Sequence, residues 1–127
     1  MITINIVPRP AARPRFSKWG TYNTPEYTKY KKELTRLVKK NTKHEPIETP
    51  LKLTVNFWLP IPKMSKKKMS EHEGVAHYKK PDLDNLVKAL SDAMNEVVFK
   101  DDNIVSSIVA HKCYSSEPRI EYKVEVL

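Results

Sequence analysis

Asp82 and Asp84 are the residues of this sequence whose type and spacing best suit chemistry. Pro81 precedes them and disfavours helix just before it, and an extended backbone here sends both carboxylates to the same side of the chain. Two ionised carboxylates in one small space repel each other unless a cation, a helix N-terminus or a shared proton offsets the repulsion. Magnesium usually takes one or two protein carboxylates and completes its shell with waters and phosphate oxygens. The doublet therefore indicates a magnesium site that acts on a phosphodiester.

Lys88 and the pair Asp101-Asp102 add further charged groups. Lys88 lies four residues after Asp84, so on a helix its ammonium can return to the face of that carboxylate and stabilise charge that develops on a phosphate. Asp101 and Asp102 fall at a boundary between elements, where carboxylates can point out of the fold. Each feature also has an ordinary structural explanation, as a helix N-cap, a surface ion pair or a solvated turn. Taken singly, these explanations stay open.

The composition fits one soluble domain with a polyanionic partner. The 127 residues suffice for one hydrophobic core but not for two, so we expect a single domain over residues 1–127. Lysine and arginine number 23 against 15 acidic residues, and the resulting net charge of +8 favours nucleic acid as the partner. The sequence has no apolar run long enough for a membrane span and does not begin like a signal peptide, so we expect a cytoplasmic protein that does not bind membranes. Cys113 is the single cysteine, which excludes a disulfide framework within one chain.

Two basic segments are the candidate DNA-binding surfaces. Residues 8–22 combine basic and aromatic side chains among prolines, which is typical of a non-regular loop that grips phosphates while a ring stacks on an unpaired base. Residues 61–80 are rich in lysine and lack periodicity, so we expect a flexible basic loop there. For any single lysine, a solvated surface position is the alternative. The candidate DNA-binding residues are Arg13, Arg15, Lys18, Lys66, Lys67, Lys68, Lys79 and Lys80.

Six regular elements must position these groups. Alternating apolar residues predict four strands, of which the last two should form an antiparallel hairpin, and apolar residues at helical spacing predict two helices. Thr24, Pro25 and Glu26 supply an N-cap, a first-position proline and a first-turn acid to the first helix. The order β-α-β-α-β-β predicts a compact α+β domain, with a mixed sheet and two helices packed on one face. The predicted elements are strands over residues 1–7, 51–59, 104–114 and 119–127 and helices over residues 25–41 and 84–98.

Three motifs carry a family resemblance. They are Lys80-Pro81-Asp82-Leu83-Asp84-Asn85-Leu86-Val87-Lys88 with Ser91-Asp92-Ala93, then Asp101-Asp102-Asn103-Ile104-Val105, and near the N-terminus Arg13-Pro14-Arg15-Phe16 with Thr21-Tyr22-Asn23-Thr24-Pro25. Together they resemble the RusA family of Holliday-junction resolvases. The chain departs from some members, which run arginines up to the doublet, by having His77-Tyr78-Lys79-Lys80-Pro81 there.

The resemblance implies roles for these residues. Asp82, Asp84 and Asp102 correspond to the catalytic, metal-binding aspartates. Lys88 corresponds to the essential lysine, and Asp101 to an accessory neighbour that is a further candidate ligand. The resemblance also implies Mg²⁺ as the cofactor, with Mn²⁺ able to substitute, and a homodimer that cuts opposing strands of a four-way junction in branched double-stranded DNA.

A helix over residues 84–98 would separate these aspartates. At 1.5 Å per residue, Asp102 would begin roughly 20 Å from Asp84 in the same chain, too far for one metal ion to bridge. Either the chain doubles back after a shorter helix, or two subunits pack these helices antiparallel so that Asp102 of one meets Asp82 and Asp84 of the other. We favour the composite site, because a two-fold interface also presents two active sites to a substrate that must be cut symmetrically.

The sequence therefore predicts a magnesium-dependent endonuclease that resolves four-way DNA junctions in recombination and repair, with no residue assigned as general base. The first alternative is a noncatalytic basic DNA-binding module, in which the aspartates cap a helix and fill a turn. The second is a magnesium-dependent hydrolase of a smaller phosphate ester, for which a charge of +8 is excessive.

Overall fold

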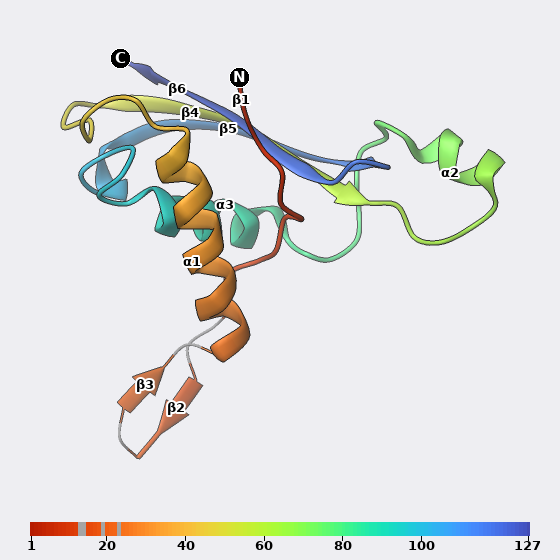
Figure 1. Ribbon diagram of the computed structural model, residues 1–127, viewed down its shortest axis with the longest axis horizontal. Helices are drawn as coiled ribbons and strands as arrows, with labels where there is room; N and C mark the ends of the chain where they lie inside the picture. Colours follow the sequence, from red (N-terminus) through yellow and green to blue (C-terminus); the bar gives the residue numbers. More distant parts are fainter. Residues whose placement is uncertain (13–14, 19, 23) are drawn as a thin grey trace.

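A four-stranded mixed sheet forms one layer of the molecule, and two helices cover one of its faces (Figure 1). The computed structural model describes residues 1–12, 15–18, 20–22 and 24–127. β4 lies inside the sheet, parallel to β5 and antiparallel to β6, and β6 in turn pairs antiparallel with β1. The predicted α+β class, the mixed sheet and the helices on one face are confirmed. The sheet has the order β1-β6-β4-β5, formed by β1 (Ile2–Ile4), β6 (Arg119–Val126), β4 (Leu51–Pro60) and β5 (Val105–Ser115).

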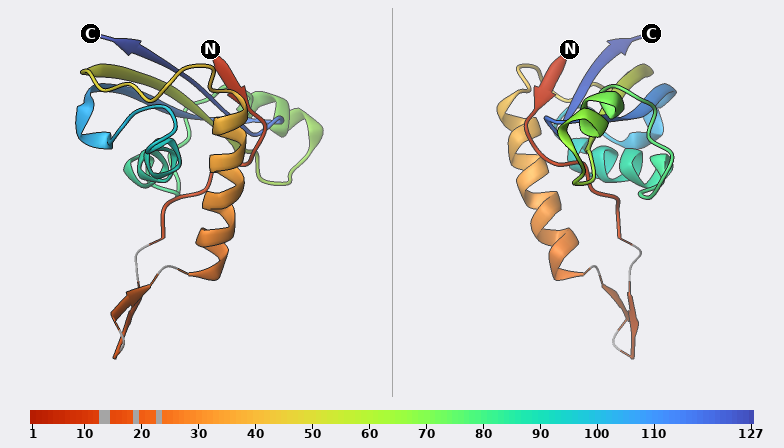
Figure 2. Two further views of the ribbon diagram at one scale, coloured as in Figure 1. Left: turned by 60° about the vertical axis from the view of Figure 1, so that its left-hand side comes forward. Right: turned by 90° about the vertical axis from the view of Figure 1, so that its right-hand side faces the viewer.

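Helices α1 (Pro25–Lys40) and α3 (Leu83–Met94) pack against each other beneath the sheet (Figures 1 and 2). α1 begins as predicted, because Pro25 is its first residue and the Thr24 Oγ1 accepts a hydrogen bond from the Tyr27 backbone N–H at 3.3 Å. Asn41 caps its C-terminus. Within the described ranges, no helix combines the length and apolar character that crossing a membrane would require.

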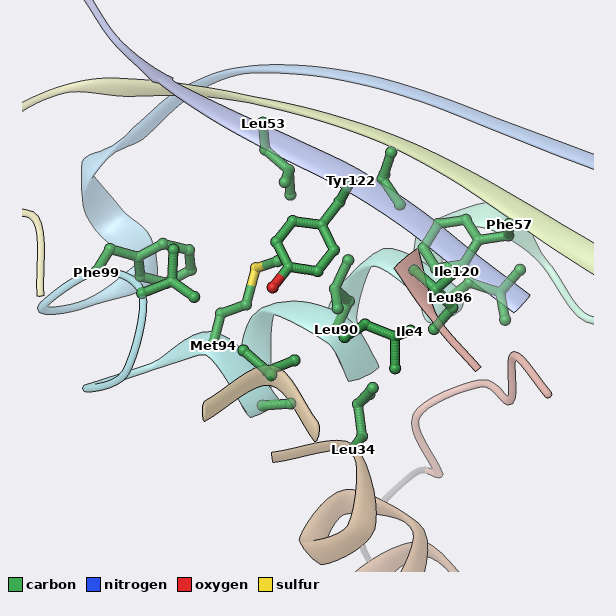
Figure 3. Packing of buried hydrophobic residues seen from close by; sticks show 14 of the residues in the cluster. Ile4, Leu34, Leu53, Phe57, Leu86, Leu90, Met94, Phe99, Ile120 and Tyr122 are labelled. Atoms are coloured by element: carbon green, nitrogen blue, oxygen red, sulfur yellow. The ribbon is translucent and has the colours of Figure 1, made fainter. Parts of the chain in front are cut away.

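The core fills the space between the helices and the sheet (Figure 3). β4 alternates strictly between buried and partly exposed residues along its length, so one of its faces lies entirely against the helices. α3 contributes Leu86, Leu90 and Met94, and Leu34 of α1 reaches the same cluster. The largest fully buried side chains of the sheet and the connection after α3 are Ile4, Leu51, Leu53, Phe57, Phe99, Ile120 and Tyr122.

The predicted hairpin of the last two strands is wrong, because β4 lies between β5 and β6. The chain does reverse after Ser115, but the reversal crosses the end of β4, so β6 starts about 10 Å from β5, or two strand spacings. Arg119 stabilises the crossing, since its Nη1 donates to the Glu117 carbonyl at 2.8 Å and to the Ser115 Oγ at 3.2 Å. A turn signal specifies that the chain reverses but not which strand it then pairs with. By inserting there, β4 gains hydrogen-bonded neighbours along both edges.

Two further elements lie in segments that were predicted to be irregular. β2 (Arg15–Ser17) and β3 (Gly20–Tyr22) form a small antiparallel hairpin that projects beyond the start of α1, away from the main sheet (Figure 2). α2 (Lys66–His72) lies within the basic segment 61–80, and the Ser65 Oγ caps it by accepting from the Lys68 backbone N–H at 3.3 Å. α2 buries no residue, so it carries no apolar periodicity by which sequence could reveal it.

α3 ends at Met94, before the predicted residue 98. Glu96 adopts a positive φ of 66°, and its backbone N–H donates to the Phe99 carbonyl at 2.8 Å. This turn buries Val98 and Phe99 in the core, so these apolar side chains reach the core without continuing the helix. The chain therefore doubles back after a shorter helix and enters β5 through a single 3₁₀ turn, η1 (Asp102–Ile104).

Candidate active site

Asp82 and Asp84 lie at the N-terminus of α3, and both are exposed. Asp82 occupies the N-cap position with an extended backbone, but its side chain makes no capping hydrogen bond. Asp84 is in the first turn, where its Oδ1 accepts from the Asn85 backbone N–H at 2.9 Å. Asp84, for which an N-cap role is the ordinary structural explanation, lies inside the first turn, and the residue at the N-cap position, Asp82, leaves its carboxylate available to a ligand.

A surface hollow of about 400 Å³ opens beside this doublet. The N-terminal segment closes one side of it, because the Ala11 backbone N–H donates to the Asn85 carbonyl at 3.0 Å. Lys112 of β5 approaches from the sheet, and its Nζ donates to the Lys79 carbonyl at 2.5 Å and to the Pro81 carbonyl at 2.8 Å. The hollow is lined by Pro10, Lys80, Pro81, Asp82 and Asn85.

Lys88 is exposed and lies one helical turn after Asp84. It forms its ion pair with Asp92, one turn farther along α3. The Lys88 Nζ and the Asp92 Oδ1 are 3.5 Å apart, and the Asp92 side chain is only 20% exposed. The Asp92 Oδ2 accepts a hydrogen bond from the Tyr27 hydroxyl of α1 at 2.8 Å. Burial, followed by this hydrogen bond and the charge of Asp92, raises the pKa of Tyr27 well above its usual value. Tyr27 therefore remains a donor that holds Asp92 in place.

Asp102 starts η1 and lies beside α3. Partial burial raises the pKa of Asp102, the hydrogen bond with Asp101 and the negative charges of Asp101 and Asp92 raise it further, and the positive charge of Lys88 lowers it. The Asp101 Oδ1 accepts from the Asp102 backbone N–H at 2.8 Å, so Asp101 caps the 3₁₀ turn. Asp102 thus shares the surroundings of Asp92 and Lys88, where a cation would relieve repulsion between carboxylates.

Asp82 and Asp84 lie at the start of α3, whereas Asp102 interacts with the charges of Lys88 and Asp92 farther along the helix. Asp84 and Asp92 are eight residues apart, which is about 12 Å along the helix axis. Magnesium–oxygen distances are about 2.1 Å, so one ion cannot reach both ends of that helix. In the part of the chain that the structure describes, no three Asp, Glu, His or Cys side chains gather closely enough to hold a metal ion. The carboxylate oxygens suit magnesium chemically, but a single chain does not bring all three aspartates onto one ion.

The candidate DNA-binding residues lie in three places. Those of α2 are exposed in its first turn, and Lys79 and Lys80 are exposed directly before the doublet, where Lys80 lines the hollow. Lys18 lies exposed in the turn between β2 and β3, Arg15 lies in β2, and Arg13 falls outside the described residues. The three α2 residues are Lys66, Lys67 and Lys68.

The basic segment between β4 and α3 is attached to the outer edge of β5. The Gly74 backbone N–H donates to the Tyr114 carbonyl, and the Tyr114 backbone N–H donates to the Val75 carbonyl, both at 2.9 Å. The Glu73 carboxylate accepts from the Ser116 backbone N–H at 2.7 Å and from the Ser115 hydroxyl at 2.9 Å, and these hydrogen bonds lower the pKa of Glu73. The lysines of α2 are therefore carried by a segment that is hydrogen-bonded to the sheet.

The sequence assigns no part in the site to Asp92, Tyr27 or Lys112. Helical spacing does place Tyr27 on the packing face of the first helix, and Lys88 with Asp92 on the exposed side of the second. The hydrogen bond from Tyr27 to Asp92 and those from Lys112 have no local signal, because each joins partners distant in the sequence.

Comparison with known proteins gives a match over nearly the whole chain. The family model described as endodeoxyribonuclease RusA matches residues 5–125. A relative in Bacillus subtilis (strain 168), the uncharacterized protein YqaN, is 37% identical over 106 residues, which covers 79% of this chain and 75% of the relative.

Proposed function

The chain belongs to the RusA endodeoxyribonuclease family, and from this premise we propose that it is a magnesium-dependent endonuclease that resolves Holliday junctions by paired phosphodiester hydrolysis in DNA recombination and repair. The observation that carries the proposal is the start of α3, where the exposed carboxylate of Asp82 makes no capping hydrogen bond and the exposed Asp84 is followed one helical turn later by the exposed Lys88. The net charge of +8 supports a polyanionic substrate larger than a simple phosphate ester.

Each charged residue has a role in this proposal. Asp82 and Asp84 bind the metal ion, Asp102 completes the ligand set, and Asp101 supports Asp102 through the 3₁₀ turn that it caps. Bound there, Mg²⁺, or Mn²⁺ in its place, would supply Lewis-acid chemistry toward the scissile phosphate and the attacking water. Lys88 adds positive charge where the phosphate becomes more negative, and Asp92 orients the Lys88 ammonium through their 3.5 Å ion pair. No residue is assigned as general base.

The proposal includes a homodimer with a composite site. Because the doublet lies at the start of α3 and Asp102 faces Lys88 and Asp92 farther along it, antiparallel packing of two such helices would bring the partner's Asp102 toward Asp82 and Asp84. β5 offers an apolar edge for such a copy, since Ile108 is 47% exposed on the side of the sheet that carries the helices. Among the described residues, the outer edge of β5 has no backbone hydrogen-bond partner before Lys112.

The exposed lysines of α2 and the pair Lys79-Lys80 are proposed to contact DNA phosphates, together with Arg13, Arg15 and Lys18 of the N-terminal segment. The α2 lysines and Lys80 precede the doublet along the chain, and in this proposal a duplex arm contacts them beside the catalytic aspartates. Contacts of this kind fix position on the backbone and carry no sequence information.

Incubation with a labelled four-way junction and Mg²⁺ tests the activity. The wild-type protein should release linear duplex products, whereas Asp84→Asn should bind the junction with unchanged affinity and cleave at least about 100-fold more slowly. Glu125→Gln, an exposed carboxylate of β6, is the matched control and should cleave at the wild-type rate. Tight binding by the wild-type protein without metal-dependent cleavage would instead identify a noncatalytic DNA-binding module.

Mixed dimers test the composite site. Chains with Asp84→Asn and chains with Asp102→Asn should each be inactive alone. When they are mixed, random pairing gives heterodimers with one intact composite site, or about a quarter of the wild-type sites, and these should nick the junction without resolving it. If each site used aspartates of one chain only, mixing would restore nothing.

A further inference from the structure

Lys112 lies on β5 with its side chain on the helix-covered face of the sheet. It is in register with Phe57, which is buried against the helices, and residues paired in register point to the same face. Lys112 is half-buried, an uncommon setting for a lysine, whose ammonium is strongly hydrated when free. Partial burial therefore requires protein partners for the ammonium protons.

Those partners are two carbonyl groups directly before the aspartate doublet. The Lys112 Nζ donates to the Lys79 carbonyl at 2.5 Å and to the Pro81 carbonyl at 2.8 Å. The Pro81 carbonyl belongs to the peptide unit that leads into Asp82. A hydrogen bond from a charged donor is roughly twice as strong as one between neutral groups. The Lys112 main chain holds the same segment, because its carbonyl accepts from the His77 backbone N–H at 3.0 Å.

Apart from Lys112, the segment meets β5 through the Tyr78 ring, which lies edge to face with Tyr114 at 6.5 Å between centroids. Among the described residues, positions 78–81 make no backbone-to-backbone hydrogen bond, and the next such bond along the chain is the Leu86 N–H to the Asp82 carbonyl inside α3. The segment stops pairing with β5 at His77, and α3 begins at Leu83. Lys112 therefore holds the path of the chain between these two points.

We propose that Lys112 is a positioning residue for the doublet: it holds the backbone of residues 79–81 against β5 so that Asp82 and Asp84 keep the geometry that the reaction needs. This inference rests on the proposed function, because it concerns the same aspartates. Two of the three ammonium protons of Lys112 are committed to carbonyls, so the residue acts on the loop and not on a DNA phosphate. Displacing reacting groups by about 1 Å can cost a reaction about 100-fold in rate.

Hydrogen exchange tests the contact without any assay of activity. In Lys112→Met, which keeps the length of the side chain but removes its donors, the hydrogen-bonded amides on either side of the held segment, those of His77 and Leu86, should exchange at least about 10-fold faster than in the wild type. Peptides from β4 and from the second half of α3 should not change. Lys112→Arg, which retains charge and donors, should restore protection. Lys123→Met, an exposed lysine of β6 paired with Glu125, is the matched control and should leave every peptide unchanged.

Kinetics on the junction then separate positioning from binding. Lys112→Met should lower kcat by about 10- to 100-fold, leave the metal-free junction Kd within about 2-fold, and be rescued by Lys112→Arg. Unchanged exchange of the His77 and Leu86 amides, uniformly faster exchange along the whole chain, or a weaker Kd with normal kcat would each overturn the positioning role. If the wild-type protein cleaves no junction, the proposed function fails, and the exchange result alone decides whether Lys112 holds the loop.

Discussion

Replacing Tyr27 by phenylalanine probes the contact that joins α1 to the charged face of α3. The Tyr27 hydroxyl donates to the Asp92 Oδ2 at 2.8 Å, and Tyr27 is only 6% exposed. Tyr27→Phe keeps the buried ring and removes one donor, so it leaves packing almost unchanged. The variant therefore isolates a single hydrogen bond to a carboxylate.

The magnitude follows from the surroundings of Asp92. Hydrogen bonds to charged groups contribute about 1.5–3 kcal/mol to stability. The Asp92 side chain is 20% exposed and keeps its ion pair with Lys88, so water and the ammonium recover part of the loss. We therefore expect Tyr27→Phe to lower the free energy of unfolding by about 1.5 kcal/mol, the lower end of this range. For a chain of this size, that loss corresponds to a fall of about 6 °C in Tm.

The pH dependence provides a second signature. The pKa of Tyr27 is raised by burial and then by Asp92, so below about pH 10 both the folded and unfolded states hold the proton and the contribution to stability is complete. Above that pH the unfolded chain releases the proton first, and stability falls as the pH rises toward the folded-state pKa. Tyr27→Phe lacks this loss, so its deficit relative to the wild type should shrink between pH 8 and pH 10.5.

Urea unfolding followed by circular dichroism at these two pH values measures both effects. Tyr78→Phe is the matched control, because Tyr78 is 75% exposed and should change stability by less than about 0.5 kcal/mol. Equal urea midpoints for Tyr27→Phe and the wild type at pH 8 would refute the reasoning, since the hydroxyl would then contribute nothing beyond what water supplies.

Three further outcomes are expected. Tyr122 is 1% exposed and its hydroxyl lies in the core without a partner in the described part of the chain (Figure 3), so Tyr122→Phe should stabilise the fold by about 1 kcal/mol in urea at pH 8. Burial raises the pKa of Tyr122 to about 12, so the gain should grow between pH 10 and pH 12, and a lower midpoint at pH 8 would contradict this account. Changing Lys66, Lys67 and Lys68 together to glutamine should reduce the slope of log K against log salt for junction binding by about 2 to 3, and an unchanged slope would remove α2 from the DNA interface. Leu90→Ala, at a fully buried position of α3, should cost about 2–5 kcal/mol in the same urea assay, and a cost below about 1 kcal/mol would mean that the site collapses around the cavity.

Elements that bury one face could be predicted from the sequence, because burial of one face requires apolar residues at the spacing of a helix or a strand. β4 and α1 are examples: strict alternation along β4 and the Thr24-Pro25 start of α1 are local signals, and the structure follows them. α2 left no such signal, since it buries nothing. The pairing of β6 depends on competition between β4 and β5 for its edge, which no local pattern encodes.

The candidate site divides in the same way. The place of the doublet at the start of α3 follows from Pro81 and the helix beyond it, both adjacent in the sequence. The contacts that hold the surrounding groups join positions 65 and 31 residues apart, from Tyr27 to Asp92 and from Lys112 to Pro81. Tyrosine and lysine at such positions look like any others until the fold brings their partners to them. The packing of α3 against α1 gives Tyr27 its role, and the packing of α3 against β5 gives Lys112 its role.

The place of β4 between β5 and β6 also determines when this protein can fold. β6 pairs with β4 on one side and with β1 on the other, so two of the three strand pairings in the main sheet need residues 119–126. A ribosome adds about 5–20 residues per second, and β1, β4 and their apolar side chains therefore wait several seconds for the strand that completes the sheet. Sheets completed by pairing between distant residues form slowly, and until then the unpaired strand edges can associate with other chains. The nascent chain should thus depend on chaperones until residues 119–126 have left the exit tunnel, and folding should follow synthesis of those residues rather than accompany it.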